Sequence, residues 1–307
     1  MRKTDFVRDL LKESIDLNKK LLGSLFHIAR SSMLYLSQLE IRDKSIEDIL
    51  VAVHEEHPWY GHRRIGWELG FSMKKTRRLM KKFGITAKQR KRKNFIKPGD
   101  QKQEDMHGKI IGGSTFGSRI MNYLARLCPL APNIVWRSDF THIIYKGIHL
   151  YLATILDDYT KEIVGYAMSY HHTKEFVLSS IQDAITKTGW IIPEYFHSDQ
   201  WSEYTSYRVL EFLQMNHISI SMSSKWSPWQ NWAQESYYGK LKLELWETKE
   251  YECMEALILA IHRQISYYNT KRLHTTLRDT PRWFREKYEE KQEFMEQKMK
   301  ESNEWKK

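Results

Sequence analysis

Three acidic residues stand where a carboxylate needs an explanation. Asp139 interrupts the β-rich run WRSDFT at 136–141, and a charge within a strand is unfavourable unless something binds it. Asp199 directly follows another β-rich run at 194–197, at the end of a strand where α/β sheets bind ligands. Glu235 falls in the first turn of a predicted helix, and 35 residues separate it from Asp199. These acids are the candidate catalytic residues.

Carboxylates from separate elements suit metal-dependent phosphoryl transfer. Two hard cations roughly 3.5–4 Å apart activate an attacking oxygen and stabilise the leaving oxygen of a phosphodiester. Mg²⁺ takes oxygen ligands and keeps several waters, so a few carboxylates suffice to hold it. Because crowded anions repel one another, we expect the site to be loose without metal. Taken singly, Asp199 could instead cap the following helix, and Glu235 could serve the dipole of its own helix.

The acids need a scaffold, and the residues from 134 onward predict one. Three β-rich runs joined by short turns predict an antiparallel meander at 134–145, 149–157 and 162–169. Periodicity then predicts a helix at 174–187, a strand at 194–197, a helix at 204–215, a strand at 217–222 and helices at 232–246 and 253–268. The order βββαβαβα predicts an α/β fold, with a mixed five-stranded sheet covered by helices in a ribonuclease-H-like arrangement.

The N-terminal third carries short predicted helices and the excess positive charge. We expect Ser45 to cap one helix, Ser72 to cap a later basic helix and Gly84 to end it. From Lys74 to Lys97, twelve of the 24 residues are Lys or Arg and none is acidic. A solvated charged face is the commoner meaning of such a run, but the lack of acids favours a helix-turn-helix that binds DNA. The candidate DNA-binding residues there are Lys74, Lys75, Arg77, Arg78, Lys81, Lys82, Arg90, Lys91, Arg92 and Lys93.

The composition restricts the class of protein. The 307 residues suffice for about two domains. A net charge of +11 indicates a polyanionic partner, either nucleic acid or a membrane surface. No apolar run approaches the roughly 20 residues of a membrane span, and the N-terminus lacks a signal-peptide core. Only two Cys are present and no Cys-x-x-Cys occurs, which disfavours a zinc site. We therefore expect a cytosolic protein that binds nucleic acid, with no membrane partner.

Several separate motifs, in the same order, resemble the larger open reading frame product of bacterial insertion sequences, a transposase of the retroviral-integrase (DDE) superfamily. The resemblance covers about four-fifths of the chain, through HPWYGHRRI at 57–65, WRSDFTHI at 136–143, YLATILDDYTKEIVGY at 151–166, HSDQWSEYTS at 197–206, SPWQNWAQESYYGKLKLEL at 227–245 and YNTKRLHTTLRDTP at 268–281. It implies that Asp139, Asp199 and Glu235 are a D,D-35-E triad holding two Mg²⁺ or Mn²⁺ ions. Asp157 matches a recurrent acid without a metal, and we interpret it as structural.

Further residues take roles from this resemblance. Lys242 lies seven residues after Glu235, so both face the same way on a helix. The resemblance implies that Lys242 contacts the DNA backbone near the scissile phosphate, although a surface lysine is the alternative. Arg272 and His274 match family positions and could bind phosphate, but an arginine in a turn is usually only solvated.

Three tryptophans depart from the family pattern. Trp201, Trp226 and Trp232 stand in the active-site loops, where the family shows glycine or another small residue. Glycine permits a positive φ or a close approach to a ligand, and an indole permits neither without cost. These aromatics could stack on unpaired bases at a transposon end. Alternatively, the gene reads UGA as glycine and was translated with UGA as tryptophan.

The resemblance implies a DNA transposase that binds transposon ends and performs metal-dependent DNA cleavage and strand transfer. The partners would be terminal repeats, target DNA, further copies of the chain and a smaller upstream open reading frame product, in the bacterial cytoplasm at the nucleoid. A catalytically inactive DNA-binding relic of an insertion element is the alternative, and a ribonuclease-H-like nuclease is a third.

We expect helices at 1–44 that could form a helix-turn-helix, a basic helix-turn-helix region at 45–97, a linker at 98–133, an integrase-like core with C-terminal helices at 134–288 and a charged tail at 289–307.

Overall fold

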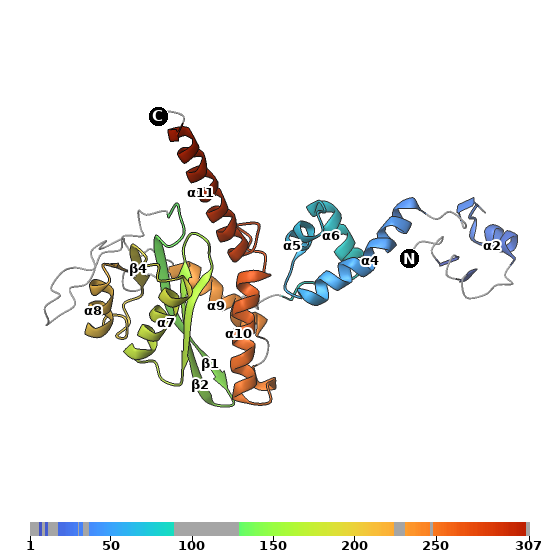
Figure 1. The fold of residues 1–307 in the computed structure, drawn as a ribbon. Coiled ribbons are helices and arrows are strands. Elements are labelled where there is room, and N and C mark those ends of the chain that lie inside the picture. Colours follow the sequence, from blue (N-terminus) through green and yellow to red (C-terminus); the bar gives the residue numbers. More distant parts are fainter. Residues whose placement is uncertain are drawn as a thin grey trace, which may run out of the picture. The chain divides into compact units, whose positions relative to one another are not determined.

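The computed structural model describes residues 18–29, 37–88, 129–223, 231–245 and 248–304, with short pieces at 6–7, 10–11 and 31–32. The chain forms two compact units, Met1–Lys88 and Gln89–Lys307 (Figure 1). Their division falls inside the predicted basic region at 45–97. The helix predicted near 119–127 lies outside the described residues. None of the helices in the described ranges has the length and apolar content that a bilayer crossing requires.

The first unit is helical, as its sequence predicts. It contains α2 (Lys19–Phe26), α4 (Gln38–Glu56), α5 (His62–Glu68) and α6 (Met73–Lys82). Leu50, Ile65 and Leu79, one from each of the last three helices, are fully buried, so these helices share one small core.

The predicted helix boundaries in this unit are mostly confirmed. The Ser72 hydroxyl accepts from the Lys75 amide at the start of α6, as expected of a cap. Gly84, just beyond α6, adopts a φ of +68°, which favours glycine. The predicted cap at Ser45 is wrong. α4 begins eight residues earlier, after Ser37, and the Ser45 hydroxyl donates to the Arg42 carbonyl inside the continuing helix.

The second unit is built on the predicted mixed sheet. Its strands β1 (Val135–Tyr145), β2 (Ile148–Asp157), β3 (Ile163–Ser169), β4 (Tyr195–Ser198) and β5 (Ser219–Met222) lie in the order β3-β2-β1-β4-β5. β1, β2 and β3 form the antiparallel meander, while β4 pairs parallel to both β1 and β5. This confirms the α/β class and the ribonuclease-H-like arrangement.

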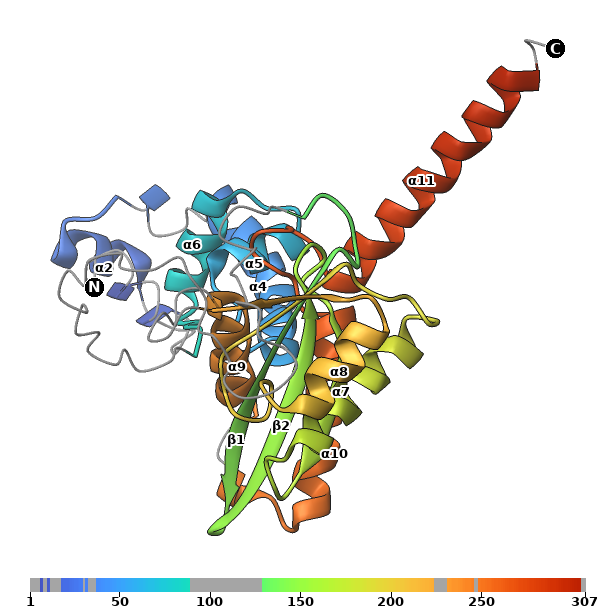
Figure 2. The same cartoon turned by 90° about the vertical axis from the view of Figure 1, so that its left-hand side faces the viewer.

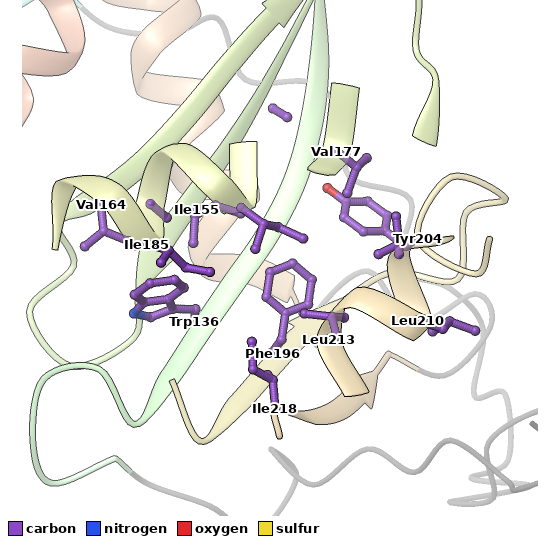
Figure 3. Close-up of a cluster of buried hydrophobic side chains, with 14 of the residues drawn as sticks. Trp136, Ile155, Val164, Val177, Ile185, Phe196, Tyr204, Leu210, Leu213 and Ile218 are labelled. Carbon is purple, nitrogen blue, oxygen red and sulfur yellow. The ribbon is translucent and has the colours of Figure 1, made fainter. Parts of the chain in front are cut away.

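Helices cover both faces of this sheet. On one face, α7 (Lys174–Lys187) and α8 (Tyr207–Met215) bury a core that includes Trp136, Ile155 and Phe196 (Figure 3). On the other face, α9 (Trp232–Glu244) and α10 (Met254–Thr270) pack on Leu152 and Leu156. Ile155 and Leu156 are adjacent in β2 and point to opposite faces, because side chains alternate along a strand. Buried on both faces, the sheet is a rigid platform for residues at its strand ends.

The chain ends in a long helix, α11 (Pro281–Glu304), after α10 and the short 3-10 helix η3 (Thr248–Glu250). α11 is joined to the sheet near its start, where Arg282 and Arg285 both bind the buried carboxylate of Glu162. From residue 289 to 300 its residues are exposed, and the helix projects away from the sheet (Figures 1 and 2). The predicted charged tail is therefore helical through most of its length.

Candidate active site

Asp139 lies in β1 at the place where the neighbouring strand stops. β4 pairs with β1 only from Val135 to Arg137, so Asp139 stands two residues beyond the last pair. On its other side Asp139 is the register partner of Thr154 in β2. Burial, with a further contribution from the nearby charge of Asp199, raises the pKa of Asp139 to about 8. A carboxylate in this position gains from a bound cation.

Asp199 is the first residue after β4 and lies beside Asp139 through the strand register. Arg137 of β1 pairs with His197 of β4, and both acids follow two residues later on parallel strands. Burial raises the pKa of Asp199, although hydrogen bonds from Ser223 and Asn231 oppose the rise. Its Oδ1 atom is buried and has no hydrogen-bond partner among the described residues. A buried, unpartnered carboxylate oxygen is an available ligand for a hard cation.

Glu235 occupies the first turn of α9 and is exposed. Partial burial, followed by the charge of Asp199, raises the pKa of Glu235. The charge of Glu235 in turn contributes to the raised pKa of Asp139. The three predicted acids are therefore electrostatic neighbours.

The described ranges, taken together, contain no group of three or more His, Cys, Asp or Glu side chains that could hold a metal ion as they stand. The donor atoms nevertheless fit Mg²⁺ or Mn²⁺, because all are carboxylate oxygens and one of them is buried without a partner. Repulsion between the acids opposes their closer approach. Residues 224–230, which lead into α9, lie outside the described part of the chain.

Buried polar side chains that sequence reasoning did not single out support the strand ends. His197 is fully buried between two hydroxyls, with Nδ1 2.9 Å from Ser221 Oγ and Nε2 3.0 Å from Ser223 Oγ. Burial, and then the charge of Arg137, lowers the pKa of His197 to about 3, so the ring is neutral. Asn231, at the start of α9, donates to the Ser138 carbonyl at 3.3 Å. The only sequence signal for this role of His197 is its place two residues before Asp199 in the motif HSD.

Lys242 and Arg272, both predicted to bind DNA, have different environments. Lys242 is exposed on α9, and its charge acts to lower the pKa of Asp139, so it lies near the site. Arg272 is only 3% exposed and pairs with the equally buried Glu244 at 2.7 Å. A phosphate cannot reach a guanidinium in that position. The structure therefore corrects the prediction for Arg272 and assigns it to the fold.

Asp157 matches its structural interpretation. Its side chain is fully buried and accepts from the backbone amides of Asn133 and Thr160, both at 2.7 Å. It thereby ties the entry to β1 to the turn after β2. Both carboxylate oxygens of Asp157 therefore accept hydrogen bonds within the fold.

The basic residues of α6 have three kinds of environment. Arg78 and Lys82 bind the buried carboxylate of Asp43, at 2.6 and 2.9 Å, and so join α6 to α4. Lys75 is partly buried, with its ammonium over the Phe71 ring. Lys74, Arg77 and Lys81 are exposed. Arg78 and Lys82 also keep 43% and 37% of their side chains exposed, so their DNA contacts stay predictions. The predicted ligands Arg90, Lys91, Arg92 and Lys93 lie outside the described residues.

The tryptophans at small-residue positions are tolerated for a simple reason. Trp201 and Trp232 are 58% and 56% exposed, and neither adopts a positive φ. The expected conformational conflict is therefore absent at these two positions, and Trp226 lies outside the described residues. The conflict is present at Trp190, a position that the sequence did not single out. Trp190 has a φ of +67°, directly after Gly189 at +72°.

Comparison with known proteins decides the family. Two family models described as integrase core domain match residues 129–228 and 216–281. The chain is 32% identical over 241 residues to the transposase for insertion sequence element IS904 of Lactococcus lactis, covering 75% of this chain and 88% of that protein. The chain belongs to the insertion-sequence transposases of the retroviral-integrase superfamily. It is thus an enzyme of the DDE polynucleotidyl-transferase family.

Other relatives are more distant. A putative transposase for insertion sequence element IS986/IS6110 of Mycobacterium tuberculosis is 26% identical over 260 residues, covering 80% of this chain and 88% of that one. Among solved structures, the HTLV-2 integrase catalytic core domain in complex with magnesium is 21% identical, with a TM-score of 0.44. It covers 51% of this chain and 98% of that chain.

Proposed function

We propose that this protein is a DNA transposase whose Asp139, Asp199 and Glu235 hold two Mg²⁺ or Mn²⁺ ions for DNA cleavage and strand transfer. The observation that carries the proposal is the strand register: Asp139 and Asp199 each stand two residues beyond the paired Arg137 and His197 on parallel strands. Family membership adds that the chemistry is polynucleotidyl transfer.

The residues of the chain have separate tasks in this reaction. Asp139 and Asp199 supply carboxylate oxygens from rigid strand ends, and Glu235 supplies a third from α9. When bound, the ions supply the positive charge that activates an attacking hydroxyl and stabilises a leaving oxygen. Lys242, exposed near Asp139, contacts the phosphate backbone beside the scissile bond.

DNA binding outside the site falls to the first unit. α6 presents Lys74, Arg77 and Lys81 to solvent, and Arg78 and Lys82 stay partly exposed beside Asp43. Cations on a helix of a three-helix module are suited to grip a DNA backbone, and their contribution falls as salt rises. We place the protein in the bacterial cytoplasm at the nucleoid, as a homo-oligomer on DNA because two transposon ends must be paired. A smaller upstream open reading frame product, fused or separate, is the other proposed partner.

The test is a strand-transfer assay with DNA carrying the terminal repeats of the element. With Mg²⁺ or Mn²⁺, we expect cleavage at the repeat and joining of the 3′ end to a target. Chelation by EDTA is expected to stop both steps and to leave salt-sensitive DNA binding intact. DNA binding without cleavage in either metal would instead indicate an inactive relic. Digestion of hybrid or branched DNA without joining would indicate a nuclease.

A further inference from the structure

Three buried polar side chains join α9 to the sheet next to the acids. Gln234, immediately before Glu235, and Thr154, the register partner of Asp139, are both fully buried. Tyr238, one helical turn beyond Gln234, is 6% exposed. Polar groups this deep are costly unless they are hydrogen-bonded, so their pairing specifies one arrangement of the elements that carry them.

Gln234 uses both ends of its side-chain amide. Its Nε2 donates to the Arg137 carbonyl in β1 at 2.6 Å and to the Thr154 carbonyl in β2 at 3.1 Å. Its Oε1 accepts from Thr154 Oγ1 at 3.1 Å. One side chain of α9 is thereby bonded to both central strands.

Tyr238 makes the second connection. Its hydroxyl lies 2.8 Å from Thr154 Oγ1 and donates to the backbone carbonyl of Asp139 itself. The helix that carries Glu235 is therefore hydrogen-bonded directly to the residue that supplies the first acid of the site.

The spacing of these bonds fixes the direction of Glu235. Gln234 and Tyr238 are four residues apart and lie on one face of α9. Glu235 follows Gln234 by one residue, about 100° further round the helix. With both contacts made, α9 can neither turn about its axis nor slide along β1 without breaking buried hydrogen bonds.

We propose that Gln234, Thr154 and Tyr238 form a brace that positions Glu235 relative to Asp139, so that these three are positioning residues for metal-dependent strand transfer. The proposal rests on the function proposed above. Side chains that orient carboxylate ligands are needed because a metal site tolerates little displacement of its ligands. The brace holds α9, and with it Glu235, against the strand that carries Asp139.

The chain offers a matched control in the adjacent tyrosine. Tyr237 is 1% exposed and packs its ring on Tyr268, with the ring centroids 4.8 Å apart. Its hydroxyl has no hydrogen-bond partner among the described residues. Tyr238→Phe and Tyr237→Phe therefore each remove one buried hydroxyl from the same helix, but only Tyr238→Phe removes a bond to the strand of Asp139.

The experiment compares the two variants in the full chain by three measurements. These are Mn²⁺ binding by titration calorimetry, amide hydrogen exchange along α9, and strand-transfer kinetics. For Tyr238→Phe we expect about tenfold weaker Mn²⁺ binding, faster exchange in α9, and a lower kcat with the KM for DNA unchanged. Tyr237→Phe should match the wild type in all three. A second pair of variants, at Thr154, controls for misfolding. Thr154→Ser keeps the hydroxyl and should resemble the wild type, whereas Thr154→Val removes it and should resemble Tyr238→Phe.

The brace is overturned if Tyr238→Phe and Tyr237→Phe have the same Mn²⁺ affinity and the same exchange in α9. It is also overturned if Tyr238→Phe lowers only the KM or the catalytic rate while metal binding and exchange stay unchanged. Failure of the proposed function looks different, because the wild type would then join no DNA strands in any metal. In that case Mn²⁺ binding and amide exchange still decide whether the brace orders α9.

Discussion

Arg272 and Glu244 form a buried ion pair, with a guanidinium nitrogen 2.7 Å from a carboxylate oxygen and both side chains at most 3% exposed. The pair joins the end of α9 to the residues that follow α10. Arg272→Ala would leave the Glu244 carboxylate buried and uncompensated. We expect a loss of about 3 kcal/mol in the free energy of unfolding, measured by urea denaturation, with no change in the salt dependence of DNA binding.

Lys242→Ala supplies the comparison for that variant. Lys242 is exposed, so its loss should leave stability within about 0.5 kcal/mol. DNA affinity should fall, and the slope of log affinity against log salt should decrease by about one. If Arg272→Ala gave the reduced slope and kept full stability, the structural role of Arg272 would be refuted.

Acid should weaken the first unit through Asp43. Hydrogen bonds from Arg78, and then from Lys82, hold the pKa of Asp43 well below its usual range despite the opposing effect of burial. A depressed folded pKa means that the unfolded chain binds the proton more readily. The stabilisation is therefore complete above the unfolded pKa of about 3.9 and is lost as the pH falls through the folded pKa.

Hydrogen exchange in α4 and α6 between pH 6 and pH 2.5 would measure this loss. We expect protection of both helices in the wild type to decline below about pH 4, after correction for intrinsic exchange. Asp43→Asn should already show lower protection at pH 6, whereas Asp48→Asn, an exposed acid of the same helix, should not. Equal protection in the wild type and Asp43→Asn at pH 6 would contradict the role of Asp43.

Trp190 carries a backbone conformation that suits glycine. Its φ is +67°, its side chain is 76% exposed, and its amide donates to the Ile185 carbonyl at 2.8 Å after the end of α7. Trp190→Gly should raise the free energy of unfolding by about 1 kcal/mol, because a left-handed conformation is costly for residues with a Cβ. Trp190→Ala keeps that cost and should give no such gain in thermal or urea unfolding. Stabilisation by alanine equal to that by glycine would show that the indole, not the backbone, is responsible.

The nucleotide sequence tests whether the unusual tryptophans are glycine codons. If UGA is read as glycine in the source, codons 201, 226 and 232 are UGA, and the strained backbone adds codon 190 to the set. Codons 136, 229 and 283, at ordinary aromatic positions, should be UGG. UGG at 201, 226 and 232 would exclude this explanation. The exposed Trp201 and Trp232 would then be available for base stacking.

The elements of the core are predictable because their residues follow regular patterns. The helix predicted at 174–187 has the same bounds as α7, because its apolar residues repeat at helical spacing. The structure adds the cap, in which the Thr173 side chain accepts from the Phe176 amide. The pairing that places Asp139 beside Asp199 is a long-range contact between β1 and β4, and periodicity carries no information about it. It followed from the βββαβαβα order and the family resemblance.

Side-chain partners were the part that the sequence could not supply. The family resemblance indicated a phosphate contact for Arg272, and only the fold shows that Glu244 neutralises its charge in the interior. Arg78 pairs with Asp43, 35 residues away in sequence, but 43% of its side chain stays exposed, so its DNA contact stays a prediction. Ser45 had a capping pattern, but its hydroxyl bonds back within α4 because the helix starts earlier. For Arg272 a tertiary contact outweighed the local pattern, and for Ser45 a longer helix did.

The central claim, that Asp139, Asp199 and Glu235 form one metal-dependent site, is tested most directly by single-turnover strand transfer with Mg²⁺. The variants are Asp139→Asn, Asp199→Asn and Glu235→Gln, which keep side-chain size and remove the charge. Glu175→Gln, an exposed acid on α7 paired with Arg208, is the control. We expect each of the three to lower the strand-transfer rate about 1,000-fold or more while DNA binding persists, and the control to match the wild type. Wild-type strand transfer by Asp199→Asn would contradict the account.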